Sequence, residues 1–544
     1  MIILILLIIA FFFVNYEKTE KSLHMLQQNL YNENNRYIKW LIKNKTILNL
    51  DLLGVMICIL GIFSAYYLEF ISVILEYILF FILILSAIRY NQNSKMDQNK
   101  KKLVITARIK RLIFTIVILF LIPSLILKSN IGDLTKNWYF IFILMVMTYA
   151  NYLLVFLAMI INTPIEKTVY QYYRKKAQKK LKEMKNLKII GITGSYGKTS
   201  SKNILSSILN CKYNALPTPK NLNTYNGLIM TINNNLDPFT DIFIAEMGAY
   251  VKGEIKGLCK LVKPKYGILT TIGTAHLESF GSEENIIEGK FELIESLPED
   301  GFAILNKDDP KQVNYHLKNK VKTIWVGIHN QDADVVAKNI KCSPKGTTFE
   351  VHLKNQTETY LFETKLLGEH NVYNILEAIA CGIEFGIEME DLIQAVKTVQ
   401  PIEHRLELKR LGNFYMIDDA YNSNPVGAKR ALDVLKMMPG IKVVVTPGMI
   451  ELGEKEEEYN ETFGQQISEV ADYVILVGEK QTKPIKKGLL DKKFDKEKII
   501  VFNDVREAYP WIRELSLREE VYALFENDLP DTYNEYRRVN KNEN

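Results

Sequence analysis

The chain has 544 residues, too many for one compact domain, so three or four structural units are expected. Its 68 lysines and arginines nearly balance its 62 aspartates and glutamates, and no nucleic-acid partner is expected. Its five cysteines lie far apart and form no C-x-x-C pair. This spacing argues against a disulfide framework or a zinc cluster and is typical of a reducing compartment. The cysteines are Cys58, Cys211, Cys259, Cys342 and Cys381.

Residues 1–165 are dominated by apolar runs, each close to or somewhat below the about 20 residues that a helix needs to cross a bilayer. We therefore predict a module of about five membrane-spanning helices over 1–165. The first run could instead be a signal peptide, but no basic segment precedes it and no small-residue cleavage site follows it, which favours a retained anchor. The runs are Met1–Val14, Leu52–Leu68, Phe70–Ile88, Leu112–Leu127 and Trp138–Ile161.

Basic residues predict the orientation of this module. Segment 89–111 carries eight lysines and arginines, whereas segment 128–137 carries two. Because basic loops stay in the cytoplasm, the N-terminus is expected outside and everything after the last span inside, at the cell membrane. Segment 166–186 contains the run RKKAQKKLKEMK, which predicts a basic juxtamembrane segment in contact with anionic lipids. A solvated helix face is the alternative for such a run.

The stretch Lys188–Ser201, KIIGITGSYGKTSS, is the strongest functional motif. A short apolar β-rich run enters a glycine-rich turn, and Lys198 and Thr199 then open a helical pattern. This arrangement points backbone N–H groups and the helix dipole at a polyphosphate. The lysine would contact the terminal phosphates, and the threonine hydroxyl would bind Mg²⁺. The spacing is shorter than a full Walker A loop, and an ordinary glycine-rich turn with a surface lysine is the alternative.

The sequence TGSYGKT resembles the ATP loop of the Mur ligase superfamily, the ATP-dependent amide-bond-forming enzymes of peptidoglycan synthesis. Further matches run to about residue 480 and are closest to the dipeptide-adding branch of that superfamily. The resemblance implies ATP and two Mg²⁺ ions as cofactors, with a cell-wall precursor and an amino acid or dipeptide as substrates. The implied ATP-binding residues of the loop are Thr193, Gly194, Ser195, Tyr196, Gly197, Lys198, Thr199 and Ser200.

From Leu187 onward, apolar runs of strand length alternate with helical patterns, which predicts an α/β domain with a parallel or mixed sheet over 187–398. Polar residues at the carboxyl ends of strands are then the candidates for ligand contact, and Glu246 and His276 hold such positions. Their surroundings resemble the metal-binding stretches of the superfamily. The resemblance implies Thr199 and Glu246 on one Mg²⁺, and His276 with a carbamylated Lys290 on a second. A plain surface lysine is the alternative for Lys290.

Two further stretches resemble the superfamily. LPTPKNLNTYNGL resembles the family loop that approaches the acceptor substrate, which implies that Asn221 and Asn223 contact this substrate. Lys220 stands where the family usually has glycine. An Asn-rich surface turn is the alternative. LLGEHNVYNILEAIA places Asn371 where the family has its adenine-binding asparagine, and Asn374 lies one helical turn further on.

A second αβ alternation begins near Pro401 and predicts a Rossmann-like domain over 399–544. Its strand candidates are Phe414–Ile417, Lys442–Val445, Tyr473–Val477, Ile499–Phe502 and Val521–Leu524. Within it, MIDDAYNSNPVGAKRAL resembles the family box that places Asp419 on the nucleotide ribose or at the hinge. EHRLE matches the family stretch whose arginine, here Arg405, reaches the γ-phosphate, and a surface salt bridge is the alternative for Arg405. Lys198, His276, Lys290 and Arg405 are therefore the expected catalytic residues.

The chain also departs from the dipeptide-adding pattern. TPGMIELGEKEEE matches a family box, but Tyr459 and Asn460 stand where a histidine is usual, and ALFENDLPDTY replaces the late K-G-S-R stretch. Nothing in 1–186 resembles a nucleotide-sugar binder. These departures leave a poly-γ-glutamate synthase-like enzyme or a ligase of lipid-linked precursors as alternatives. A membrane P-loop ATPase for transport and a tethered protein with a dead ATP site are alternatives of other classes.

Overall fold

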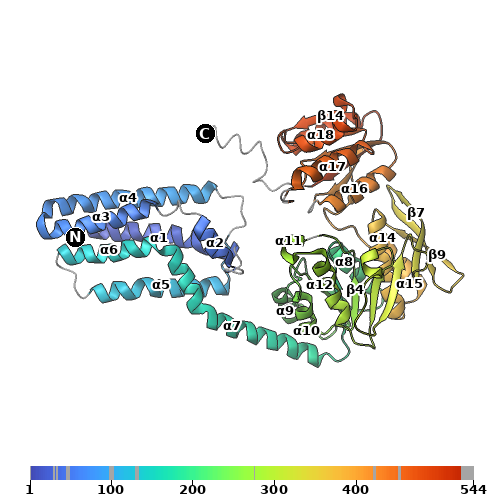
Figure 1. The fold of residues 1–544 in the computed structure, drawn as a ribbon, viewed down its shortest axis with the longest axis horizontal. Helices are drawn as coiled ribbons and strands as arrows, with labels where there is room; N and C mark the ends of the chain where they lie inside the picture. Colours follow the sequence, from blue (N-terminus) through green and yellow to red (C-terminus); the bar gives the residue numbers. More distant parts are fainter. Residues whose placement is uncertain are drawn as a thin grey trace. The chain divides into compact units, whose positions relative to one another are not determined.

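The computed structural model describes residues 2–28, 31, 35–43, 49–96, 103–128, 134–274, 276–420, 424–450, 452 and 455–527. The chain folds as two compact units, Met1–Tyr172 (unit 1) and Tyr173–Asn544 (unit 2). Figure 1 shows that unit 1 is helical, whereas unit 2 consists of sheets covered by helices.

Unit 1 contains long helices, several of which run alongside one another in Figure 1. The described residues of every apolar run found in the sequence lie in helix, apart from single breaks at Leu68 and Ala150. The elements are α1 (Ile2–Gln28), α2 (Arg36–Lys43), α3 (Asn49–Tyr67), α4 (Glu69–Met96), α5 (Ala107–Lys128), α6 (Leu134–Tyr149) and α7 (Asn151–Glu183), the last of which continues into unit 2.

The apolar run Trp138–Ile161 is not one uninterrupted helix, because the chain changes from α6 to α7 at Ala150. Lys18 Nζ donates a hydrogen bond to the Thr148 carbonyl (2.6 Å), and Thr148 Oγ1 donates to the Leu144 carbonyl (2.9 Å). Side chains that hydrogen-bond to helix carbonyls compete with the backbone hydrogen bonds of the helix, and the helix bends at that point. α7 extends through most of the segment 166–186, to Glu183, and the assignment of this segment as juxtamembrane stays a prediction.

The described residues contain two helices that are long and apolar enough to cross a membrane, Phe70–Ile88 within α4 and Asn151–Glu183. Leu52–Ala65 and Trp138–Tyr149 are shorter apolar helices. Five spans therefore stay a prediction. Of the basic segment used to predict orientation, residues 97–102 lie outside the described residues.

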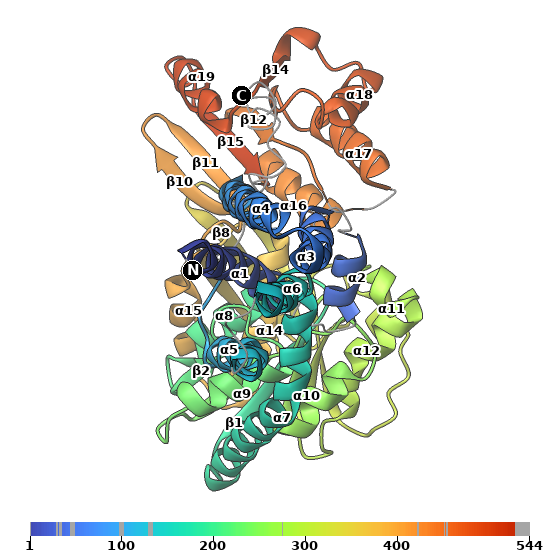
Figure 2. The same ribbon diagram turned by 90° about the vertical axis from the view of Figure 1, so that its left-hand side faces the viewer.

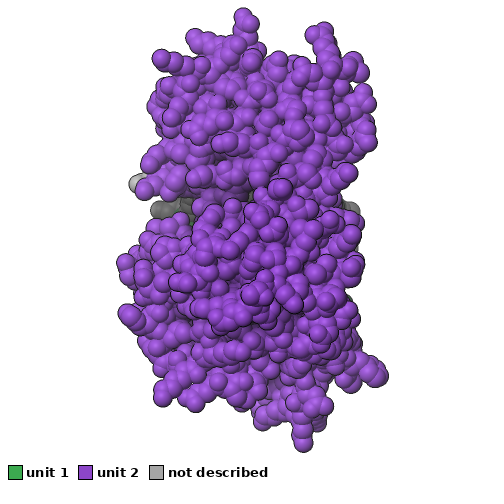
Figure 3. Space-filling model, turned by 90° about the vertical axis from the view of Figure 1, so that its right-hand side faces the viewer, with its two compact units in different colours: residues 1–172 green, residues 173–544 purple. Residues whose placement is uncertain are grey.

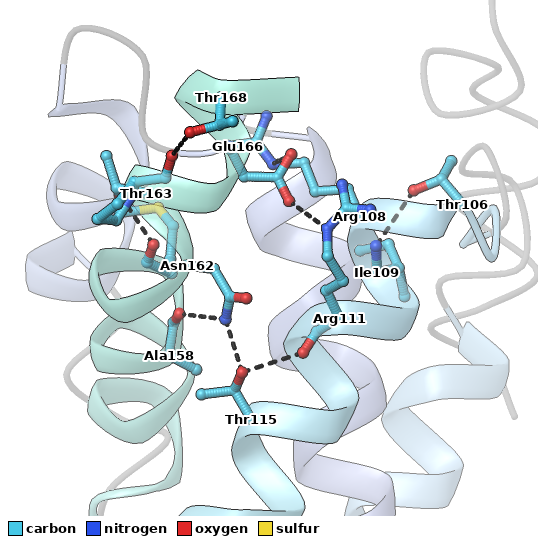
Figure 4. Close-up of polar contacts among 12 residues, drawn as sticks. Thr106, Arg108, Ile109, Arg111, Thr115, Ala158, Asn162, Thr163, Glu166 and Thr168 are labelled. Atoms are coloured by element: carbon cyan, nitrogen blue, oxygen red, sulfur yellow. Dashed lines mark hydrogen bonds and ion pairs between the residues drawn. The ribbon is translucent and has the colours of Figure 1, made fainter. Parts of the chain in front are cut away.

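Polar contacts join α5 to α7 within unit 1 (Figure 4). Arg111 Nε donates to Glu166 Oε1 (2.7 Å), and Arg108 lies 3.8 Å from the other carboxylate oxygen. Asn162 Nδ2 donates to Thr115 Oγ1 (2.7 Å). Arg108 and Arg111, which the sequence placed in a basic loop, therefore belong to the first turns of α5.

The first α/β domain of unit 2 contains a nine-stranded mixed sheet in the order β2-β3-β1-β4-β5-β6-β7-β8-β9. The ladders from β2 to β7 are parallel, whereas β7–β8 and β8–β9 are antiparallel. The strands are β1 (Lys188–Thr193), β2 (Ala215–Pro217), β3 (Ile242–Glu246), β4 (Tyr266–Leu269), β5 (Phe302–Asn306), β6 (Lys322–Gly327), β7 (Val335–Ser343), β8 (Gly346–Leu353) and β9 (Thr359–Thr364).

Helices pack against this sheet through apolar side chains, as the α/β prediction requires. Ile204 and Ile208 of α8 and Ile375 and Ile379 of α14 join Ile190 of β1 in one buried core. The helices are α8 (Lys198–Leu209), α9 (Tyr225–Asn234), α10 (Glu254–Val262), α11 (Leu277–Phe280), α12 (Glu283–Glu295), α13 (Pro310–Val313), α14 (Glu369–Glu384) and α15 (Met389–Thr398).

The second α/β domain contains a six-stranded sheet in the order β10-β11-β15-β12-β13-β14, parallel except for β10–β11. Figure 2 shows α17 and α18 on one face and α19 on the other. The elements are β10 (Glu407–Leu411), β11 (Phe414–Asp419), α16 (Pro425–Met437), β12 (Ile441–Thr446), α17 (Glu456–Ser468), β13 (Tyr473–Val477), α18 (Lys483–Asp491), β14 (Ile499–Phe502), α19 (Ala508–Leu515) and β15 (Val521–Glu526), with short 3₁₀ turns at Lys496–Lys498 and Val505–Glu507. The predicted mixed α/β architecture is confirmed.

Candidate active site

The glycine turn between β1 and α8 has a backbone that only glycine adopts easily. Gly194 has φ +154°, and a Cβ there would lie 2.0 Å from Thr270 Oγ1. Gly197 has φ +82° and caps α8, which begins at Lys198 as the sequence predicts. The turn therefore presents an open helix N-terminus, the arrangement that binds phosphate groups.

A cavity of about 690 Å³ lies in unit 2 and is lined by both α/β domains. Figure 3 shows the surface of unit 2, which is indented across its middle. The first domain contributes the glycine turn, called the phosphate turn below, and polar residues at strand ends. The second domain contributes side chains from β11, α16 and their neighbours. The lining residues expected from the sequence are Ser195, Tyr196, Gly197, Lys198, Thr199, Ser200, Asn221, Asn223, Glu246, His276, Arg405 and Asp419.

The remaining expected residues lie beside this cavity rather than on its wall. Thr193 is fully buried and donates from Oγ1 to the Met247 carbonyl (2.9 Å). Asn371 is buried and donates from Nδ2 to the Leu367 carbonyl (2.9 Å), whereas Asn374 does line the cavity. Neither Gly194 nor Lys290 contributes to the lining.

Lys198 turns its ammonium back onto the loop. Nζ donates to the carbonyls of Gly194 (2.6 Å) and Ser195 (3.1 Å). Burial lowers the pKa of Lys198 to about 8, so it is mostly charged at neutral pH. A nucleotide phosphate would have to replace these carbonyls as the partner of the ammonium.

Glu246, the last residue of β3, is the centre of a buried polar network. Its Oε1 accepts from Thr199 Oγ1 (3.3 Å) and Asn223 Nδ2 (2.9 Å), and its Oε2 accepts from Lys202 Nζ (2.9 Å). Lys202 also donates to the Lys220 carbonyl (2.6 Å). Sequence reasoning missed Lys202, and the one available signal was its position four residues after Lys198, on the same face of α8.

The pair of Thr199 and Glu246 fits a magnesium ion. A hydroxyl and a carboxylate oxygen 3.3 Å apart are hard oxygen donors beside the phosphate turn, and Mg²⁺ takes few protein oxygens when it also binds phosphates. The described residues hold no cluster of three or more His, Cys, Asp or Glu side chains suited to a metal. A metal at this site would therefore depend on substrate oxygens.

His276 and Lys290 belong to a second polar group. The His276 ring lies against Tyr250, with ring centroids 4.5 Å apart, and its backbone is left-handed at φ +63°. Burial and the nearby charges of Lys290 and Lys198 lower the pKa of His276, which keeps the imidazole neutral. Lys290 is 2% exposed, and burial lowers its pKa to about 7.

Residues of the second domain complete the cavity. Burial raises the pKa of Asp419 to about 6, and its Oδ1 accepts from the Leu406 backbone N–H (3.2 Å). The sequence did not single out His370, Tyr373, Arg430 or Asn527, which also line the cavity. Asn460 is structural, because its side chain bonds both backbone groups of Met449 (each 2.9 Å). Tyr421, Asn422, Ser423, Glu451, Gly453 and Glu454 of the two family boxes lie outside the described residues.

Comparisons with known proteins match both α/β domains. Residues 192–382 match the Mur ligase middle domain, and residues 404–523 match the Mur ligase glutamate ligase domain. The UDP-N-acetylmuramoyl-tripeptide:D-alanyl-D-alanine ligase of Bacillus subtilis is 34% identical over 330 residues, covering 60% of this chain and 70% of the relative. The Escherichia coli enzyme of the same name is 32% identical over 293 residues, covering 53% and 64%.

Solved structures agree with these sequence matches. MurF from Acinetobacter baumannii aligns with a TM-score of 0.58 at 27% identity, covering 68% of this chain and 80% of that chain. MurF from Thermotoga maritima, solved in complex with ADP, aligns with a TM-score of 0.58 at 26% identity and covers 68% and 82%. With both catalytic domains matched in sequence and in fold, the chain belongs to the Mur ligase family of ATP-dependent carbon–nitrogen ligases.

Proposed function

We propose that this chain is a membrane-anchored ATP-dependent ligase that joins an amino substrate to the carboxylate of a peptidoglycan precursor. The observation that carries the proposal is the cavity of about 690 Å³, in which the phosphate turn, Glu246 and His276 of one domain face Arg405 and Asp419 of the other. The named substrates of the relatives, a UDP-N-acetylmuramoyl tripeptide and D-alanyl-D-alanine, are the first candidates for acceptor and amine.

In the proposed reaction the acceptor carboxylate attacks the γ-phosphate of ATP, giving an acyl phosphate and ADP. The amine then attacks the acyl carbon, and phosphate leaves. The N-terminus of α8 and Lys198 bind the phosphates, Arg405 neutralises charge on the γ-phosphate, and Asn221 and Asn223 orient the acceptor. Fixed charges aimed at the transferring group usually contribute more to such catalysis than any other effect.

Two metal positions belong to this proposal. Thr199 and Glu246 would hold the first Mg²⁺, and His276 with Lys290 would hold the second. Bound Mg²⁺ supplies charge neutralisation and alignment of the phosphoryl group. A neutral amine is required for carbamylation by CO₂, and a pKa of about 7 leaves Lys290 largely unprotonated at pH 8, which supports this modification.

Unit 1 is proposed as a membrane module of about five spans, with both catalytic domains on the cytoplasmic side. Its helices expose large apolar side chains, which in a soluble protein would be an aggregation hazard and in a bilayer would face lipid. They include Phe12 (70% exposed), Phe63 (64%), Phe70 (79%), Phe81 (67%) and Phe114 (67%). The basic half of α7, including Lys175, Lys176 and Lys179, would contact anionic lipid headgroups.

A ligase of lipid-linked precursors is the second candidate. It is favoured because the family match begins at residue 192, and the residues before it form an apolar helical unit. An acceptor held in the membrane by its lipid would need no nucleotide-sugar domain on the enzyme. Because ALFENDLPDTY replaces the K-G-S-R stretch, neither candidate function specifies which amine is the second substrate.

The test uses the full chain in lipid nanodiscs, supplied with ATP and Mg²⁺. The acceptors are UDP-N-acetylmuramoyl tripeptide and its lipid-linked counterpart, and the amines are D-alanyl-D-alanine, D-alanine and L-glutamate. ADP release that needs both an acceptor and an amine, with the ligated product identified by mass, supports the proposal. ADP release without any acceptor would instead indicate a transport ATPase and would contradict it.

A further inference from the structure

We propose that Lys202 is a positioning residue that couples the magnesium-binding carboxylate to the acceptor loop, and this inference rests on the proposed function. The acceptor loop is defined here as residues 218–224, between β2 and α9. Lys202 is 1% exposed, and its ammonium bonds Glu246 Oε2 (2.9 Å) and the Lys220 carbonyl (2.6 Å). One buried cation therefore contacts both the metal site and the acceptor loop.

The first consequence concerns Glu246. Because Lys202 occupies Oε2, only Oε1 is directed toward Thr199, where a metal beside the phosphates would lie. The ammonium also offsets the negative charge that the carboxylate presents to a cation. Lys202 therefore restricts Glu246 to one metal-facing oxygen and weakens its hold on the ion.

The second consequence concerns the loop. Lys220 has a left-handed backbone at φ +50°, which is unfavourable for a residue with a side chain. The hydrogen bond from Lys202 to its carbonyl helps to hold this conformation. Asn223, three residues on, bonds Glu246 Oε1 (2.9 Å), and its carbonyl accepts from the Gly248 N–H (2.8 Å). A change at Glu246 on metal binding is therefore transmitted to the loop from both sides.

If Lys202 were only the partner of Glu246 in a structural ion pair, its loss would have other effects than if it couples the metal site to the loop. Breaking a buried ion pair leaves an uncompensated charge, which destabilises the fold and lowers all activities together. Coupling instead separates the effects: loss of the ammonium strengthens metal binding while it weakens acceptor binding. Because allosteric coupling is reciprocal, it also predicts that metal binding alters the loop more strongly in the wild type than in the variant, which keeps only the Asn223 contact.

The test compares wild type with Lys202→Met in nanodiscs, without turnover. Mn²⁺ affinity in the presence of ADP is measured by electron paramagnetic resonance, and hydrogen exchange of residues 218–224 is measured with and without Mn²⁺–ADP. We expect Lys202→Met to bind Mn²⁺ several-fold more tightly and to show a smaller Mn²⁺-dependent change in loop exchange, because the contact between Asn223 and Glu246 remains. Lys212→Met is the matched control, because the Lys212 ammonium bonds the Gly386 carbonyl and Lys212 does not line the cavity.

Kinetics gives an independent readout with the acceptor that supports ADP release in the wild type. The KM for this acceptor should rise about tenfold in Lys202→Met, the size of a lost hydrogen bond to a charged group, while the KM for ATP stays the same. If Lys202→Met does not fold, Lys202→Gln, which keeps a donor without the charge, takes its place in every measurement. Unchanged Mn²⁺ affinity and loop exchange would overturn the inference. If no acceptor supports ADP release, the proposed function fails, yet the Mn²⁺ and exchange measurements still decide the role of Lys202.

Discussion

Ser201 Oγ donates a hydrogen bond to Glu377 Oε2 (2.7 Å) and so joins α8, which carries Lys198, to α14, which carries Asn371. Glu377 is 3% exposed, and burial raises its pKa from 4.5 to about 7. Between these two values the folded state binds more protons than the unfolded state. The contribution of Glu377 to stability is therefore full below pH 4.5 and is lost as the pH rises through 7.

We predict that Glu377→Gln, which stays neutral at every pH, gains stability over the wild type as the pH increases from 5 to 8. The difference could reach roughly 3 kcal/mol, because each unit of pKa shift corresponds to about 1.4 kcal/mol. Thermal unfolding of both proteins across this pH range is the measurement. Parallel unfolding curves for Glu377→Gln and wild type would contradict the assigned pKa.

Lys198→Ala should lower ATP-dependent ligation at least about 100-fold, because the variant loses the cation at the phosphate turn. Membrane insertion should be unchanged, since Lys198 lies in unit 2 and outside every apolar helix. ADP release in nanodiscs and the membrane-bound fraction are the measurements. Lys338→Ala, an exposed position on β7, is the control. Full substrate-dependent ADP release by Lys198→Ala would show that the loop does not bind ATP.

Arg405→Lys should lower kcat about ten- to a hundredfold with little change in ADP affinity. Lysine keeps the charge but lacks the planar fork that binds two phosphate oxygens at once, and the proposed contact would be made only when the γ-phosphate is present. Rates of ADP release and equilibrium binding of ADP separate the two effects. Arg410→Lys, on the neighbouring strand β10, should behave as wild type. Equal losses in kcat and ADP affinity would place Arg405 on another part of the nucleotide.

Lys290→Ala should be inactive and should regain activity when short carboxylic acids such as acetate or propionate are added. The added acid would supply the carboxylate that a carbamylated lysine provides beside His276. ADP release against acid concentration is the measurement, and Lys198→Ala should show no such rescue. A folded Lys290→Ala protein without rescue would count against carbamylation.

Local patterns in the sequence predicted most of both sheets. In the second α/β domain, β13 and β14 have the predicted bounds, and β11, β12 and β15 differ from their predicted bounds by one or two residues. β3, β5 and β15 are buried along their whole length and therefore read as continuous apolar runs, whereas β14 is half-buried throughout. β2, β7, β8, β9 and β10 were missed. Partly exposed strands such as Glu407–Leu411, ELKRL, carry charged side chains and lack such a run.

The residues of the candidate site likewise include some that the sequence predicted and some that it missed. The turn from β1 into α8 was predicted because its glycines and lysine are adjacent in the chain. Lys202 was missed because its partner Glu246 lies 44 residues away, and no local pattern shows that a lysine on a helix is buried. The division of Trp138–Ile161 was missed for the same reason, because the Lys18 ammonium that bonds the Thr148 carbonyl comes from a position 130 residues earlier.

The hydrogen bonds from Lys198 to its own loop affect how this site receives a nucleotide. The ammonium already donates hydrogen bonds to two peptide oxygens, so the loop presents a hydrogen-bonded cation rather than a bare one. Binding is then an exchange of oxygen ligands around one nitrogen, with a net gain smaller than the full attraction between lysine and phosphate. A polyphosphate that also reaches the amides at the start of α8 recovers this cost, whereas a single free phosphate ion does so far less completely.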